Sequence, residues 1–230
     1  MNTIFVAGTD TSAGKTVVTG LLGCYLLKKG YRVVTQKWVQ TGCSGFSGDI
    51  DIHLKLMGKK ADDFLDYFSL MRPYVFRFAS SPHLAARLEG KRININKIEK
   101  SLNSLTKHFD FVIVEGSGGL MVPLNAKNLV IDVIKALNID VLVVAGNKLG
   151  VINHTLLSIE ALRARKINIL GIIFNNISDD ENKIILKDNP EILKKLTKEE
   201  VLGILPWVKN PCRLQRRFIP IGNKISARYE

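Results

Sequence analysis

Short apolar runs alternate with longer segments of helical pattern along the chain. The apolar runs are rich in Val and Ile and nearly continuous, as in strands that are buried on both faces of a parallel sheet. They predict strands at 3–7, 32–37, 111–115, 141–145, 169–175 and 201–205. The segments between them predict helices at 15–29, 50–57, 82–88, 96–107, 129–137, 154–165 and 190–196.

This alternation predicts an α/β fold of three layers, with a mostly parallel central sheet flanked by helices. The chain has 230 residues, of which 46% are apolar, so we expect one packed domain over residues 1–230. The glycine- and serine-rich segment 42–48 follows the second predicted strand. We expect it to form a mobile loop at the carboxyl end of the sheet, where parallel sheets bind ligands.

The segment GTDTSAGKT, residues 8–16, connects the first predicted strand to the first predicted helix. Unpaired N–H groups at the start of that helix, and the positive end of its dipole, favour a bound phosphate. Gly14 allows close approach of the backbone, Lys15 reaches phosphate oxygens, and the Thr16 hydroxyl can bind Mg²⁺. Five residues separate the first glycine from Gly-Lys, where the usual motif has four, but no required group is lost. We therefore expect a P-loop NTPase fold that binds a nucleoside triphosphate.

Carboxylates near this loop are candidate magnesium ligands, because Mg²⁺ prefers oxygen ligands from one or two carboxylates together with phosphates. Glu115 ends the third apolar run and precedes the glycine-rich segment 116–119. Asp49 and Asp51 begin a predicted helix, where either could cap the helix or reach the metal. We expect Thr16, Glu115 and one aspartate, with Asp49 preferred, to hold Mg²⁺.

The charge, the lengths of the apolar runs and the cysteines limit the kinds of ligand and the cellular setting that we expect. The net charge of +12 is spread along the chain without aromatic residues interleaved, which favours small anionic ligands over nucleic acid. No apolar run is long enough to span a bilayer, so no membrane partner is expected. The three cysteines are too scattered for a disulfide framework or a zinc site, and a cytoplasmic setting fits best.

Several motifs in this order resemble the dethiobiotin synthetases, over residues 1–208. They are Gly8-Thr9-Asp10-Thr11 with Gly14-Lys15-Thr16; Lys37 with Thr41-Gly42; Ser81-Pro82-His83 with Ala85-Ala86; Val114-Glu115-Gly116 with Gly118-Gly119; Leu149-Gly150 with Ile152-Asn153-His154; and Gly171 with Asn175. The longer phosphate loop is usual in that family. The resemblance implies an ATP- and Mg²⁺-dependent ligase of biotin biosynthesis that joins CO₂, supplied as bicarbonate, to 7,8-diaminononanoate. The products are dethiobiotin, ADP and phosphate, formed through a carbamate and a carbamic–phosphoric anhydride.

The resemblance also implies roles for single residues. The catalytic residues would be Lys37, Lys15 and Thr11. The nucleotide-binding residues would be Asp10, Thr11, Ser12, Ala13, Gly14, Lys15, Thr16, Val17, Glu115, Asn175 and Pro206, with Asn175, or its neighbour Asn176, reading adenine. The substrate-binding residues would be Thr41, Gly118, Leu149, Gly150, Val151 and Asn153, the last four from the partner subunit of a homodimer that binds the substrate tail across its interface. Asn153 could also cap the helix predicted to start at 154.

Two positions depart from the family pattern. Trp38 stands where proline is usual, and we expect it to reshape the floor of the pocket. Ser117 stands where alanine is common, and it removes no required group.

An alternative function is an ATP switch of the partitioning or positioning type, which dimerises and binds DNA or membrane. That class has a lysine early in the loop, whereas positions 9–13 are Thr, Asp, Thr, Ser and Ala. It also uses an amphipathic or basic tail. Here Pro211, Pro220 and Gly222 are expected to interrupt a helix in the tail. A P-loop amidotransferase ligase would need a further glutaminase domain, for which we expect no room in the chain.

Overall fold

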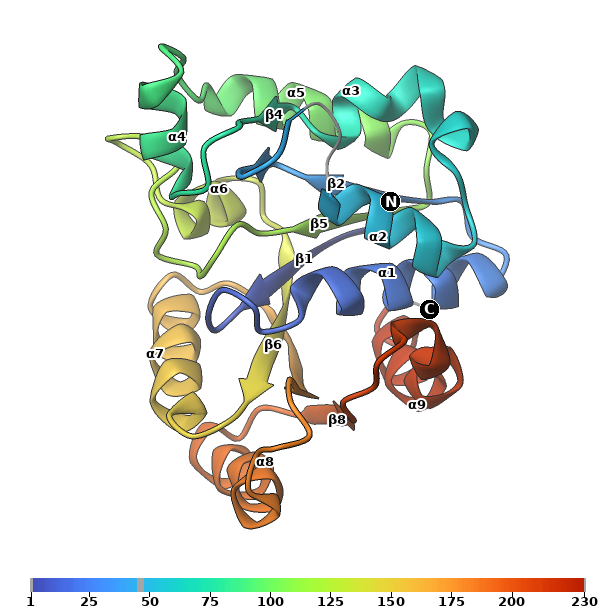
Figure 1. Cartoon of the computed structure of the whole chain (residues 1–230), viewed down its shortest axis with the longest axis vertical. Helices are drawn as coiled ribbons and strands as arrows, with labels where there is room; N and C mark the ends of the chain where they lie inside the picture. Colours follow the sequence, from blue (N-terminus) through green and yellow to red (C-terminus); the bar gives the residue numbers. More distant parts are fainter. Residues whose placement is uncertain (1, 45–47, 230) are drawn as a thin grey trace.

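The structure, a computed structural model, describes residues 2–44 and 48–229 (Figure 1). Within these residues, a six-stranded parallel sheet has the order β2-β5-β1-β6-β7-β8. Its strands are β1 (Asn2–Gly8), β2 (Val33–Lys37), β5 (Phe111–Glu115), β6 (Asp140–Asn147), β7 (Ile169–Asn176) and β8 (Val201–Leu205). All six predicted strands are confirmed to within two residues at either end.

Helices cover both faces of the sheet, which confirms the three predicted layers. One face carries α1 (Lys15–Lys28), η2 (Pro211–Leu214) and α9 (Gln215–Ser226). The other face carries η1 (Ala61–Tyr67), α3 (Phe68–Met71), α4 (Pro82–Leu88), α5 (Ile95–Thr106), α6 (Val130–Ala136), α7 (Val151–Ala164) and α8 (Lys183–Thr197). The remaining helix, α2 (Gly48–Met57), packs against α1 and contributes to both cores. A short parallel pair, β3 (Val39–Gln40) with β4 (Tyr74–Val75), was not predicted, because two residues carry no readable pattern.

Each central strand buries alternate side chains in two different cores. In β1, Ile4 and Val6 belong to the core under α1 and α9, whereas Phe5 and Ala7 belong to the core on the opposite face. Burial on both faces is the reason why these strands read as continuous apolar runs.

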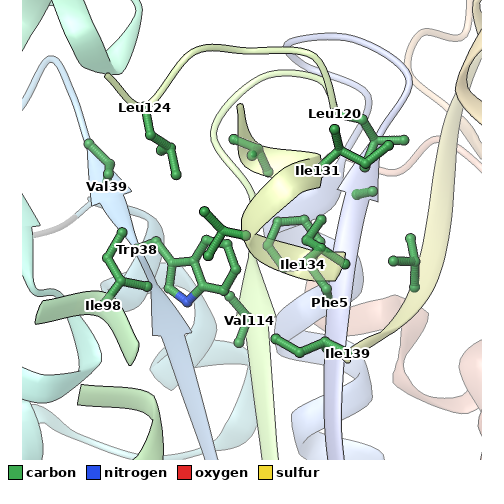
Figure 2. Packing of buried hydrophobic residues seen from close by; sticks show 14 of the residues in the cluster. Phe5, Trp38, Val39, Ile98, Val114, Leu120, Leu124, Ile131, Ile134 and Ile139 are labelled. Carbon is green, nitrogen blue, oxygen red and sulfur yellow. The ribbon is translucent and has the colours of Figure 1, made fainter. Parts of the chain in front are cut away.

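Trp38 belongs to the same core as Phe5, on the face opposite α1 and α9, and lies away from the pocket. It lies beside Phe5, Ile98 and Val114 (Figure 2), with its ring centroid 4.9 Å from that of Phe5. Its indole Nε1 donates to Gln36 Oε1 at 3.0 Å. The expectation that Trp38 shapes the pocket floor is therefore wrong, because successive side chains of extended backbone point to opposite faces and Lys37 takes the ligand side.

The helix predicted at 190–196 begins earlier than predicted, at Lys183, and Pro190 lies inside it. Proline has no N–H to donate to the carbonyl four residues before it, which is that of Leu186. Asn147 Nδ2 donates to that carbonyl at 2.9 Å instead. The helix continues through the proline because a side chain at the end of β6 supplies the missing donor.

The segment after 208 is also helical, contrary to the expectation that its prolines and glycine would interrupt a helix. Pro220 lies inside α9, whose apolar face is buried against α1 and β8 (Figure 1). A Cβ at Gly222 would lie 2.5 Å from the Tyr25 ring, so this glycine permits close packing of α9 on α1. Tertiary burial outweighs the poor helix propensity of both residues.

Two further expectations concern loops and membranes. Residues 45–47 of the predicted mobile loop 42–48 lie outside the described residues. Among the residues that the structure describes, no helix is both long enough and apolar enough to span a membrane.

Candidate active site

The phosphate loop joins β1 to α1 and ends in a glycine that no other residue could replace without strain. Gly14 has φ of 100°, and a Cβ there would lie 2.1 Å from Asn175 Nδ2. Asn175 at the end of β7 donates through Nδ2 to the Ala13 carbonyl at 3.1 Å. The Asn175 side chain thus fixes the phosphate loop, although its strand, β7, is separated from β1 by β6 in the sheet.

Lys15, the first residue of α1, folds back over the loop. Its Nζ donates to the Asp10 carbonyl oxygen at 2.9 Å, and the side chain is buried. Burial, followed by repulsion from the Lys37 ammonium group, lowers the pKa of Lys15 to about 8. An anionic ligand in the loop would relieve both effects, which is the electrostatic signature of a phosphate site.

Lys37 and Glu115 meet at the carboxyl edge of the sheet because β2 and β5 are neighbours with these two residues in register. Lys37 Nζ lies 2.7 Å from Glu115 Oε1 and 2.8 Å from Asp49 Oδ2, and it donates to the Gly116 carbonyl at 2.9 Å. These contacts use all three N–H donors of the ammonium group.

The buried pair is held in its charged form by mutual attraction. Burial alone would lower the pKa of Lys37, but the carboxylates of Glu115 and Asp49 outweigh it and raise that pKa. Burial alone would raise the pKa of Glu115, but Lys37 and His53 together lower it to about 2. Both side chains therefore carry charge at neutral pH.

Three oxygen donors converge beside this pair. The Thr16 hydroxyl donates to Glu115 Oε1 at 3.0 Å and lies 3.3 Å from Asp49 Oδ1. Asp51, the rival aspartate, is exposed on α2. Among the described residues, no cluster of three or more His, Cys, Asp or Glu side chains could hold a metal unaided. Two carboxylates and a hydroxyl fit a magnesium ion whose other ligands come from phosphates and water.

His53 is a buried polar residue that the sequence analysis did not single out. It lies on α2 one turn after Asp49, and its Nε2 is 2.7 Å from Glu115 Oε2. The spacing of four residues places Asp49 and His53 on the same helix face, which is the signal that could have found it.

A cavity of about 720 Å³ opens at this edge of the sheet. It brings together most of the predicted phosphate, metal and substrate-head residues. Its predicted lining residues are Thr11, Ser12, Gly14, Lys15, Thr16, Val17, Lys37, Thr41, Asp49, Glu115 and Gly118. Its other lining residues are Val39, Gln40, Ala79, Ser80, Ser81, Pro82, Ser117 and Val122. Four predicted nucleotide residues lie outside this set, namely Asp10, Ala13, Asn175 and Pro206.

The two rival asparagines at the end of β7 have different surroundings. Asn175 contacts the phosphate loop, as described above. Asn176 Oδ1 accepts from Asn147 Nδ2 at 3.0 Å and so belongs to the network that holds α8. Of the two, Asn175 is the one beside the phosphate loop.

The predicted substrate-tail residues lie at the turn from β6 to α7, outside the cavity of their own chain. The helix begins at Val151 and not at 154, with Gly150 as N-cap at φ of 89°, so Asn153 lies in the first turn and is not the cap. Leu149 is highly exposed, and its N–H donates to the Glu181 carboxylate at 3.0 Å. A carboxylate of the same chain therefore occupies part of this helix start.

The comparisons with known proteins agree with this geometry. A family model described as an AAA domain matches residues 2–211. The ATP-dependent dethiobiotin synthetase BioD of Chlorobaculum tepidum is 44% identical over 225 residues, which cover 94% of this chain and 93% of that protein. The ATP-dependent dethiobiotin synthetase BioD 2 of Haemophilus influenzae is 40% identical over 186 residues, which cover 81% of this chain and 97% of that protein.

Solved structures show the same fold in more distant proteins. The cell division ATPase MinD of Pyrococcus furiosus has a TM-score of 0.62 and 17% identity, and the match covers 99% of both chains. At this identity the likeness shows the fold alone, which confirms the predicted P-loop architecture. The much higher identity to the two synthetases, over most of each chain, carries the assignment: the chain belongs to the dethiobiotin synthetase family.

Proposed function

We propose that this protein catalyses the ATP-dependent carboxylation and ring closure of 7,8-diaminononanoate to dethiobiotin, with release of ADP and phosphate. The observation that carries the proposal is that Lys15, Lys37 and Glu115 surround one cavity in a chain of this family. The phosphate loop would bind ATP, and the groups beyond Lys37 would bind the diamine.

The proposed chemistry has three steps. One amine of the substrate adds to CO₂ and loses a proton, which gives a carbamate. A carbamate oxygen attacks the γ-phosphorus and ADP leaves, which gives a carbamic–phosphoric anhydride. The second amine then attacks the carbonyl carbon, phosphate leaves with the former carbamate oxygen, and a five-membered cyclic urea closes. The carbamate and the transferring phosphoryl group are both anionic, so cations must hold them together.

The cations of the site suit this requirement. Lys15 and the N–H groups at the start of α1 would hold the phosphates, and Thr11 would donate to the transferred group. Lys37 would contact the carbamate and the developing anhydride. Because all three of its donors have partners, it would exchange one of them for the substrate. The protein would act mainly by positioning and charge neutralisation.

Thr16, Asp49 and Glu115 would hold the magnesium ion that accompanies ATP. The Thr16 hydroxyl already lies within hydrogen-bonding distance of both carboxylates. When bound, Mg²⁺ supplies neutralisation of the negative charge on the β- and γ-phosphates.

The strand order separates the two ligands. The phosphate loop follows β1, in the middle of the sheet. On one side of β1, Thr41 follows β2 and the short strand β3, and Gly118 follows β5; these two residues would bind the diamine head. On the other side of β1, Asn175 lies near the end of β7 and Pro206 follows β8; these two residues would bind adenine. The reacting groups would then meet over the phosphate loop.

We further propose that the protein is a homodimer. The residues that would bind the substrate tail lie at the start of α7, whereas the cavity of the same chain is lined by other elements. A second copy that presents its own α7 start would supply N–H groups of this helix start to the substrate carboxylate.

A coupled assay tests the proposed reaction. The protein is incubated with ATP, Mg²⁺, bicarbonate and the diamine, and phosphate release and product mass are recorded. We expect release that requires the diamine, and transfer of one oxygen from ¹⁸O-labelled CO₂ to phosphate per turnover. Release that depends on DNA or lipid vesicles, and not on the diamine, would contradict the proposal and favour an ATP switch.

A matched pair of variants locates the reaction in the cavity. Lys37→Met is expected to lower kcat by about 100-fold or more, because it removes a positioned cation. Lys100→Met changes an exposed lysine on α5 and is expected to leave kcat unchanged. If the two substitutions lowered kcat equally, the proposed role of Lys37 in the reaction would lose its support.

A further inference from the structure

His53 is a buried side chain to which the proposed reaction assigns no role. Its exposure is 0%, and that of Glu115 is 1%, so their contact is shielded from water. The imidazole lies on the far side of the Glu115 carboxylate from Lys37, which contacts the other oxygen. The carboxylate is therefore held between two nitrogen groups from different elements.

The direction of this hydrogen bond follows from the partners. Glu115 is ionised beside Lys37, so its Oε2 accepts and His53 Nε2 carries the proton. His53 Nδ1 is buried and has no hydrogen-bond partner among residues 2–44 and 48–229. The proton that the imidazole shares with Glu115 is therefore the one on Nε2.

The contact fixes how the carboxylate is turned. With Oε2 anchored by His53, Oε1 lies 3.0 Å from the Thr16 hydroxyl and 2.7 Å from Lys37 Nζ. Without the imidazole, Oε2 would be buried without this partner, and the carboxylate could rotate to seek another. Its oxygen would then leave the position beside Thr16.

The helix that carries His53 is brought close by small residues on α1. A Cβ at Gly20 would lie 2.7 Å from Leu56 Cδ1 and 3.2 Å from the His53 Cα atom. The absence of a side chain at Gly20 thus allows α2 to approach α1 closely. That approach brings both Asp49 and His53 to Glu115.

We propose that His53 is a positioning residue that orients the Glu115 carboxylate toward the phosphate loop and thereby sets the affinity for the divalent cation of the nucleotide. The proposal rests on one part of the proposed function, namely that Glu115 serves this cation. Polar groups that orient metal ligands typically change metal affinity or activity by about 10- to 100-fold when they are removed.

Three substitutions distinguish positioning from simple packing. In His53→Gln the side-chain amide nitrogen can take the place of Nε2, whereas in His53→Asn it is too short to do so. His53→Leu fills the space without a donor. We expect Mn²⁺ to bind the ADP complex about tenfold more weakly in H53N and H53L, and within about threefold of the parent in H53Q. ADP binding without metal is expected to stay unchanged in all three.

Calorimetry with Mn²⁺ and ADP measures these affinities without any turnover, and thermal melting shows whether each variant is folded. If H53L does not fold, the pair of H53Q and H53N decides. Unchanged Mn²⁺ affinity in H53N, or a loss in H53Q as large as in H53N, would overturn the proposal. A ¹⁵N-histidine NMR spectrum is expected to show a proton on Nε2, in signals that H53Q lacks, and a ring without a proton on Nε2 would also overturn the proposal.

These measurements separate the two proposals. The expected order of Mn²⁺ affinities supports the role of His53 even if the protein makes no dethiobiotin. Conversely, dethiobiotin formation with equal Mn²⁺ affinities would support the proposed reaction and refute the role of His53. In an active protein, kcat is expected to fall in H53N while the KM for the diamine stays unchanged.

Discussion

At the scale of single residues, the site is a set of charges that balance one another before any ligand binds. Lys37 is satisfied by Asp49, Glu115 and a carbonyl, and Glu115 is in turn satisfied by Lys37, Thr16 and His53. Such a network holds the charged groups in place before an anionic ligand arrives, and Lys37 then has to exchange only one partner.

The sequence predicted which charged residues meet here, because a loop motif and two strand ends mark them. It did not predict the contact of His53 with Glu115, which joins residues 62 positions apart. The four-residue spacing from Asp49 places His53 on the helix face that meets the site, but it does not name Glu115 as the partner. The roles of the lining residues in binding and catalysis remain predictions.

The geometry distinguishes the two aspartates that the sequence left open. Asp49 contacts Lys37 and Thr16, whereas Asp51 is exposed. We expect Asp49→Asn to lower kcat by at least about tenfold and to raise the Mg²⁺ concentration needed for half-maximal rate. Asp51→Asn is the control and should match the parent. Initial rates over a Mg²⁺ titration measure both quantities. A fall in kcat confined to the Asp51 variant would show that Asp51, and not Asp49, serves the metal.

Glu181 is expected to compete with the substrate carboxylate at the start of α7. Its carboxylate accepts from the Leu149 N–H, in the segment proposed to bind the substrate tail. Glu181→Gln would weaken this competition, and the KM for the diamine is expected to fall about two- to fivefold with kcat unchanged. Glu191→Gln, an exposed change on α8, is the control. Steady-state kinetics test the idea, which an unchanged or higher KM would refute.

At the scale of elements, the positions of helices are set by small residues and by side chains that replace missing donors. Gly20 and Gly23 let α2 approach α1, and Gly222 lets α9 approach it as well. Asn147 compensates for Pro190 in α8. Periodicity located the strands and most helices, but it began α8 at Pro190 instead of Lys183, and it missed α9. In both cases contacts far away in sequence outweighed a local signal.

Gly20→Ala tests whether the close packing of α2 matters for the site. Alanine improves helix propensity by about 1 kcal/mol, so any loss must come from crowding against Leu56 and the His53 backbone. Overpacking of this kind destabilises by about 1–3 kcal/mol, and it should also weaken binding of Mn²⁺ with ADP. Urea unfolding and calorimetry measure the two effects. A Gly20→Ala variant that matches the parent in both measurements would refute the argument.

At the scale of the whole molecule, Tyr229, which follows α9, packs against the amino-terminal ends of the sheet strands. The Tyr229 ring packs 5.5 Å from that of Phe111 at the start of β5, and its hydroxyl donates to Asp140 Oδ2 at 3.0 Å. This end of the sheet is opposite to the cavity. A change at Tyr229 should therefore alter stability and leave the chemistry intact.

Tyr229 makes stability depend on alkaline pH. Burial, followed by the Asp140 carboxylate, raises the pKa of Tyr229 above its ordinary value of 10.0. Above pH 10 the unfolded chain loses this proton while the folded protein keeps it, so the free energy of unfolding falls as pH rises. Between pH 8 and 10.5 the parent should lose about 1 kcal/mol more than Tyr229→Phe does. Urea titrations at both values measure the difference, and parallel losses in the two proteins would count against it.

The central place of β1 has a consequence for how such a protein can diversify. The strands on one side of it carry the groups proposed for the diamine head, and β7 and β8 on the other side carry the groups proposed for the base. Each half could accumulate substitutions while the shared loop between them stays constant. Selection for a new nucleotide base and selection for a new amine head would then act on different strands, so the two specificities could change independently.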